Sequence, residues 1–165
     1  MRKLTIILLL LFSTLVQADL PDKNKFYVGA GFGSNSIDEF DDASGYQLFV
    51  GYDLDYKLGQ FSTAIELGYM DSGDFDYNLN VPGNPTNISG SIEAGGVWAT
   101  GLAKYKIHND ISFLGRLGFD FGDDDGAMYG VGIDYKLSPS LDLRGEYVLR
   151  NEIDSLQVNI VFHLN

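Results

Sequence analysis

The sequence predicts an all-β fold, an eight-stranded antiparallel up-and-down transmembrane β-barrel. Three observations support this prediction: a last segment in which apolar and polar residues alternate, seven earlier segments of the same kind, and an apolar N-terminus typical of export. Successive side chains of a strand point to opposite faces, so alternation gives each strand one apolar and one polar face. Such strands cross a membrane only as a closed sheet, because hydrocarbon offers no partner to free backbone groups.

Residues 1–18 are organised like a signal peptide. A basic start precedes a largely apolar run at residues 4–16, and small residues precede a predicted cleavage after Ala18. The run is too short for a membrane-spanning helix, which takes about 20 residues. We therefore predict a signal peptide at 1–18 and an outer-membrane β-barrel domain at 19–165. A short N-terminal membrane anchor is the alternative.

Composition excludes several classes of protein. The chain has no cysteine, which excludes disulfides, thiolate metal sites and a lipid-modified N-terminal cysteine. The formal net charge of −12 argues against nucleic acid as a partner. Twenty glycines, 10 tyrosines and 11 phenylalanines suit closely packed strands and aromatic belts at a membrane interface. Nothing in the pattern indicates a cofactor.

Eight alternating segments account for the strands. They lie at residues 26–33, 46–54, 61–69, 88–107, 111–121, 129–137, 141–150 and 156–164. The fourth is the weakest, because Trp98 and Leu102 share one parity whereas Val97 and Tyr105 share the other. We expect a bulge or a change of register there. Eight strands is the smallest usual number for a membrane barrel.

The polar face of the segments fits a narrow lumen, since it combines glycines with charges of both signs, while the apolar face suits lipid. A soluble β-sandwich or lipocalin-like barrel, with the apolar face in its core, is the alternative. Four inward charges lie in mid-segment: Glu66, Arg116, Arg144 and Glu146. Unpaired ions would be costly in so dry an interior, so we expect a structural ion network that fills and closes the lumen. A narrow passage for ions is the alternative.

The connections predict which end faces outward. Long connections at residues 34–44, 71–87, 122–126 and 151–154 alternate with short turns, as extracellular loops and periplasmic turns do in outer-membrane barrels. The long set is strongly acidic. The longest carries Asp74, Phe75, Asp76 and Tyr77, which we expect to form a recognition loop with exposed aromatics; a solvated spacer is the alternative.

A run of three aspartates, Asp123 to Asp125, lacks the ligand spacing of a calcium loop. We expect it to be a solvated acidic tip, and we predict no metal site.

Glycine-broken strand motifs recur in a fixed order along the chain. They are Phe26-Tyr-Val-Gly-Ala-Gly-Phe-Gly33, Glu66-Leu-Gly-Tyr69, Gly115-Arg-Leu-Gly-Phe119, Gly130-Val-Gly-Ile-Asp-Tyr135 and Leu143-Arg-Gly-Glu-Tyr147. As an ordered set covering the exported part, they resemble the small bacterial outer-membrane β-barrel proteins, often called porin-family proteins. These include the barrel of outer-membrane protein A, the outer-membrane protein X group and the opacity-type adhesins. The resemblance implies the outer membrane of a Gram-negative bacterium and a structural or adhesive role at the cell surface.

The chain is not expected to be an enzyme, and no catalytic residue is assigned. His108 falls in a predicted inner turn and His163 near the periplasmic end, and neither has a partner by spacing. A porin-like passive channel and a lipid-modifying enzyme are the alternative functions.

The partners we expect are outer-membrane lipid and lipopolysaccharide, with periplasmic chaperones and the barrel-assembly machinery during biogenesis. An extracellular protein could bind through the acidic loops, and we expect the barrel to be a monomer.

Overall fold

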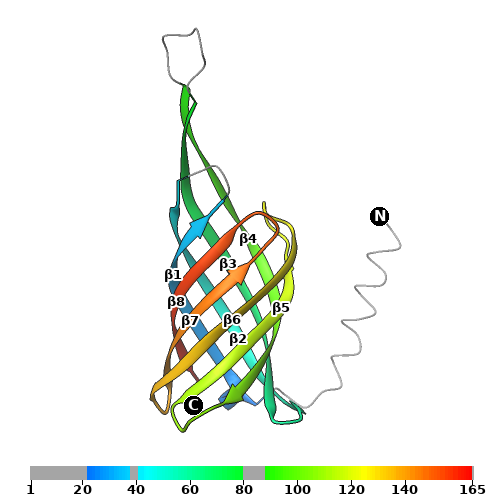
Figure 1. Ribbon diagram of the computed structural model, residues 1–165. Coiled ribbons are helices and arrows are strands. Elements are labelled where there is room, and N and C mark those ends of the chain that lie inside the picture. Colours follow the sequence, from blue (N-terminus) through cyan, green and yellow to red (C-terminus); the bar gives the residue numbers. More distant parts are fainter. Residues whose placement is uncertain (1–21, 38–40, 80–87, 165) are drawn as a thin grey trace, which may run out of the picture.

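The computed structural model describes residues 22–37, 41–79 and 88–164, and these residues form a closed antiparallel barrel (Figure 1). The predicted signal peptide and its cleavage site lie outside the described residues. After a short 3-10 helix, η2 (Lys23–Lys25), come eight strands. They are β1 (Phe26–Ser36), β2 (Ala43–Leu58), β3 (Phe61–Leu79), β4 (Ile88–Lys106), β5 (Ile111–Asp120), β6 (Gly126–Ser138), β7 (Leu141–Leu149) and β8 (Asp154–His163).

Each strand pairs with its neighbours in sequence, and β8 closes the barrel on β1. The closing register runs from Tyr27 opposite His163 to Ser36 opposite Asp154. The backbone N–H of Leu164 donates to the carbonyl of Phe26 just below this ladder. The predicted fold class and the closing role of the last strand are therefore confirmed. No helix in the described part of the chain is long and apolar enough to cross a membrane.

The two faces of the strands point as the alternation predicts. Large apolar side chains cover the outside: Phe32, for example, is 78% exposed and Leu117 69% exposed. The charges in mid-strand point inward and are buried, among them Glu66, Arg144 and Glu146. A soluble fold with an apolar core would show the reverse distribution, so the predicted facing is correct.

Residues 71–79 correct the predicted loop at 71–87. They continue β3, and β4 already begins at Ile88, so the two strands form a hairpin that rises far above the other strands (Figure 1). We call residues 74–79 and 88–93 the β3–β4 hairpin; residues 80–87 lie outside the described part. Aspartate, glycine and asparagine are poor strand formers, but pairing with β4 overrides that local preference.

The expected irregularity near the fourth strand lies instead in β3. The register shifts between Asp71 and Asp74, and Gly73 has a φ of +71°, a left-handed conformation that favours glycine. The hydroxyl of Ser72 accepts a hydrogen bond from the N–H of Ala94 across this bulge. The fourth strand looks irregular in sequence because Trp98 and Leu102 fill the lumen side with apolar groups.

Candidate functional site

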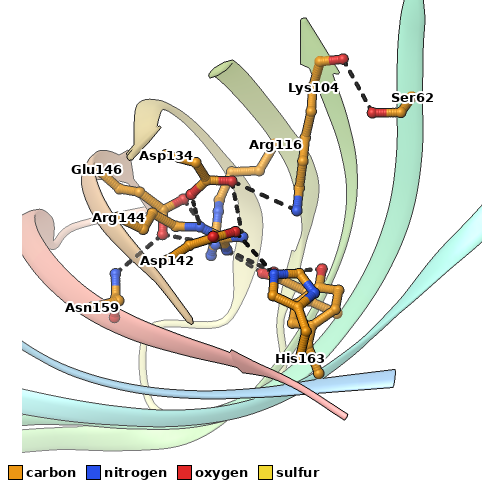
Figure 2. Close-up of polar contacts among 11 residues, drawn as sticks. Ser62, Lys104, Arg116, Asp134, Asp142, Arg144, Glu146, Asn159 and His163 are labelled. Carbon is orange, nitrogen blue, oxygen red and sulfur yellow. Dashed lines mark hydrogen bonds and ion pairs between the residues drawn. The ribbon is translucent and has the colours of Figure 1, made fainter. Parts of the chain in front are cut away.

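Glu66, on β3, is the centre of the ion pairs inside the barrel; the two arginines that it binds, Arg116 and Arg144, are labelled in Figure 2. Its Oε1 accepts from Arg144 Nη1 at 2.6 Å and from the Tyr27 hydroxyl at 2.8 Å. Its Oε2 accepts from Arg116 Nη2 at 2.9 Å. The structure thus brings Glu66 together with both arginines predicted from the sequence, and all three side chains are inaccessible to solvent.

Glu146 and Asp134 extend these contacts across the lumen. Arg116 Nη2 also lies 2.8 Å from Glu146 Oε1, and Arg144 Nε lies 2.6 Å from Asp134 Oδ1. Lys104 approaches Asp134 at 3.6 Å. We call these six residues the lumen ion network: Lys104, Glu66, Arg116, Asp134, Arg144 and Glu146. Three carboxylates face three cations, so the network is formally neutral.

Aromatic and glycine residues shape the space around the network. The Arg116 guanidinium lies 5.0 Å from the centre of the Trp98 ring, a favourable cation–π arrangement. Opposite Tyr27, Gly51 leaves room for the phenol ring, since a Cβ there would lie 2.1 Å from a ring carbon. The inward glycines therefore admit large side chains into the narrow barrel.

A second polar layer lies nearer the long-loop end of the barrel. Arg150 Nε lies 3.1 Å from Asp120 Oδ2, and Arg150 Nη1 donates to the Ser155 hydroxyl at 2.7 Å. That hydroxyl donates to Asn35 Oδ1 at 2.6 Å. Ion pairs and hydrogen bonds thus cross the barrel at two heights.

The predicted recognition residues lie on β3 and not in a loop. Asp74 and Asp76 are exposed, but Phe75 is fully buried, which corrects the expectation of exposed aromatics there. Alternation along the strand explains the difference, because Phe75 belongs to the face that packs with the buried apolar residues. Repulsion from the Asp71 carboxylate, with those of Asp74 and Asp123, raises the pKa of Glu93 on the facing strand.

Asp124 corrects the expectation of a solvated acidic tip. It is buried, and its two carboxylate oxygens accept from the N–H groups of Glu152 and Ile153, each at 2.9 Å. Burial raises the pKa of this carboxyl, against the effect of the two hydrogen bonds. Asp123 accepts from the N–H of Gly95 at 3.0 Å. These aspartates tie the β5–β6 connection to its neighbours.

The histidines lie at the short-turn end. His108 is exposed in the β4–β5 turn. His163 Nε2 lies 2.9 Å from Asp142 Oδ2, a partner that sequence spacing missed because β7 and β8 are joined in space by their ladder. Among the residues that the structure describes, no group of three or more His, Asp or Glu side chains is arranged to hold a metal ion.

Three members of the interior contacts were not assigned to the ion network from the sequence. Asp134 lies directly opposite Arg144 in the β6–β7 register, so strand pairing could have found it. Tyr27 and Lys104 reach their partners across the lumen, and no local pattern marks such contacts.

The sequence profile of the family described as outer membrane protein beta-barrel domain matches residues 4–161. Outer membrane protein A of Shigella flexneri is 27% identical over 170 residues, covering 86% of this chain and 45% of that protein. Outer membrane protein A of Escherichia coli O157:H7 is 27% identical over 166 residues, with 86% and 44% covered. The chain thus spans less than half the length of these relatives.

Among solved structures, a de novo designed transmembrane β-barrel superimposes with a TM-score of 0.60 and 18% identity, covering 87% of this chain and 97% of the design. The solution structure of the design TMB2.3 gives 0.58 at 18% identity, with 86% and 95% covered. At this identity the likeness shows the fold alone.

Proposed function

Because the chain belongs to the outer membrane protein beta-barrel domain family, we propose that its barrel is a scaffold that presents the β3–β4 hairpin for contacts at the bacterial cell surface. The family places the chain in the bacterial outer membrane. The observation that carries the proposal is the rise of this hairpin beyond the other strands (Figure 1). In this family the long connections face outward, so the hairpin extends away from the cell.

The hairpin offers strand edges to a partner. The β2 ladder reaches β3 only as far as Asp71, opposite Tyr46. The β5 ladder begins at Trp98 of β4, and the N–H of Asp123 reaches Gly95. Beyond these points, within the described residues, β3 and β4 pair only with each other. An edge of this kind can take up an extended peptide as an added strand.

The charge of the hairpin selects the partner. Asp74, Asp76 and Glu93 are exposed on it, and Asp71 lies at its base. Like charges at this density repel acidic partners and attract basic ones. The proposed ligand is therefore a basic, extended segment of an extracellular protein.

The barrel itself has a structural role in this proposal. The lumen ion network would fill the interior and join strands on opposite sides of it, without forming a pore and without catalysis. Its outer face would contact outer-membrane lipid and lipopolysaccharide, and the barrel would act as a monomer. Export would use a signal peptide cut after Ala18, with periplasmic chaperones and the barrel-assembly machinery delivering the chain.

Removal of the hairpin tests the proposal. Residues 73–93, which include the bulge glycine, can be replaced by Asn-Gly; in the register that sets Asp71 opposite Gly95, Ser72 and Ala94 then face each other across a two-residue turn. Cells displaying this variant should lose binding to a lysine-rich extended peptide and to immobilised extracellular-matrix protein, while the protein stays folded in the membrane. A triple variant, Asp74→Lys, Asp76→Lys and Glu93→Lys, should lose peptide binding as well.

Charge reversal at Asp125 and Glu152 is the matched control, since both residues are exposed in the β5–β6 and β7–β8 connections, outside the hairpin. This control should bind the peptide like the unmodified protein. Undiminished binding without the hairpin, or an equal loss in the control, would reject the proposal.

A further inference from the structure

A groove on the outer wall of the barrel is separate from both the lumen and the hairpin. Its floor consists of Thr63 on β3, Gly101 and Ala103 on β4, and Gly115 on β5. Thr63, Ala103 and Gly115 lie directly opposite one another in the strand register. These small residues lie among large apolar side chains of the outer face, and they leave a groove of about 450 Å³.

Large apolar side chains form the walls of this groove. Ile65 of β3 is 53% exposed and Leu117 of β5 is 69% exposed, so both side chains project outward from the sheet. A second depression of about 480 Å³ shares Ile65 and Gly101 and continues to Ala99. The groove therefore follows β4 from Ala103 to Ala99, with a wall on each side.

The dimensions of the groove fit one hydrocarbon chain. Neighbouring strands lie about 4.8 Å apart, so the β3 and β5 backbones are roughly 10 Å apart, and their side chains narrow this gap. Four residue steps along β4 give a length of roughly 13 Å. The convex outer wall of a second barrel, covered with large side chains, does not enter so narrow a channel along its length.

We propose that this groove binds one acyl chain of a glycerophospholipid from the periplasmic leaflet. The groove lies in the half of the barrel that ends in the short turns, which face the periplasm in this family. Lys57, exposed in the β2–β3 hairpin, follows Tyr56, which lines the groove. An ammonium at this level suits a lipid phosphate, and a tyrosine suits the membrane interface.

Two glycines allow a matched test. A Cβ at Gly101 would meet only the Leu117 carbonyl oxygen, at 3.9 Å, so Gly101→Leu fills the groove without a clash at the Cβ. Gly145, which is exposed on β7 outside the groove, has nothing within 4 Å of such a Cβ, so Gly145→Leu adds the same side chain elsewhere. Ala103→Leu blocks the floor at a second position.

Native mass spectrometry of the folded, detergent-solubilised barrel with added diacyl phosphatidylethanolamine measures the bound lipid directly. The unmodified protein and Gly145→Leu should each retain one lipid. Gly101→Leu and Ala103→Leu should lower the bound fraction about tenfold, the change expected when roughly 1.4 kcal/mol of affinity is lost.

Three outcomes would overturn the proposal. They are equal lipid retention by all four proteins, no retained lipid on the unmodified barrel, and a dimer of the unmodified barrel that Gly101→Leu abolishes. Because the groove lies far from the hairpin, Gly101→Leu should leave peptide binding unchanged. Removal of the hairpin should likewise leave lipid retention unchanged.

Discussion

Arg116 is the residue through which the energetics of the lumen ion network can be measured. Its Nη2 atom lies 2.9 Å from Glu66 Oε2 and 2.8 Å from Glu146 Oε1, and its side chain is inaccessible to solvent. Arg116→Met keeps an unbranched apolar side chain but removes the guanidinium that lies over the Trp98 ring, and with it the charge. In this variant Glu66 keeps its ion pair with Arg144. Glu146 loses its ion pair, and among the described residues its remaining contact shorter than 3.5 Å is a hydrogen bond from the neutral amide of Asn159.

Removal of one partner from a buried ion pair costs about 3–5 kcal/mol, because a charge is left without compensation. We therefore expect Arg116→Met to lower the free energy of unfolding by about this amount. Adding Glu146→Gln removes the stranded charge, so the double variant should recover about 0.5–3 kcal/mol relative to the sum of the single changes.

These free energies can be measured by urea unfolding in lipid vesicles. The folded fraction is read from a gel, on which unboiled folded protein and boiled unfolded protein migrate differently. Asp76→Ala, an exposed substitution on the hairpin, should change stability by less than about 0.5 kcal/mol. A loss in Arg116→Met no larger than in Asp76→Ala, or strict additivity in the double variant, would refute the reasoning.

Three further predictions concern the loops, the hairpin and the interior glycines. Asp124→Ala should cost about 1–3 kcal/mol in the same unfolding assay, since the buried N–H of Ile153 loses its acceptor, whereas Asp125→Ala should be neutral. The raised pKa of Glu93 means that the folded protein holds this proton more tightly than the unfolded chain, so its contribution to stability falls as pH rises through the titration. Asp71→Asn should move the pKa of Glu93, measured by NMR titration, back toward its ordinary value, and Asp76→Asn should not. Gly51→Ala should cost about 1–3 kcal/mol by overpacking against Tyr27, while Gly145→Ala should not destabilise the barrel.

The strands, their closure and their facing follow from local alternation, and that signal is why they could be predicted. Each outward or inward assignment needs only the parity of a residue within its own strand. Once Glu66, Arg116, Arg144 and Glu146 are all assigned to the lumen, their proximity follows from the small size of an eight-stranded barrel. The contacts of Tyr27 and Lys104 depend on the distance across the lumen, which parity does not contain.

The errors share one physical cause, which is that pairing between distant segments overrides local propensity. Asp71 to Leu79 reads as a loop in sequence, yet the facing strand β4 holds it extended, and the apparent turn at Gly73 is a bulge. Asp124 reads as a solvated acidic residue, yet the β7–β8 connection supplies two N–H donors to it. The sequence around Asp71 to Leu79 does not indicate pairing with β4, and the sequence around Asp124 does not indicate the donors of the β7–β8 connection.

Single-channel conductance measurements in planar bilayers test most directly whether the lumen ion network fills the barrel. The unmodified protein, inserted in its heat-modifiable folded form, should show no discrete openings if, as we propose, the ion pairs and the aromatic side chains around them fill the interior. Replacing Arg116 with Ala removes a large side chain from the lumen and should open a conducting path in the same preparation. Stable unitary currents from the unmodified barrel would contradict the structural role of the network and favour a channel.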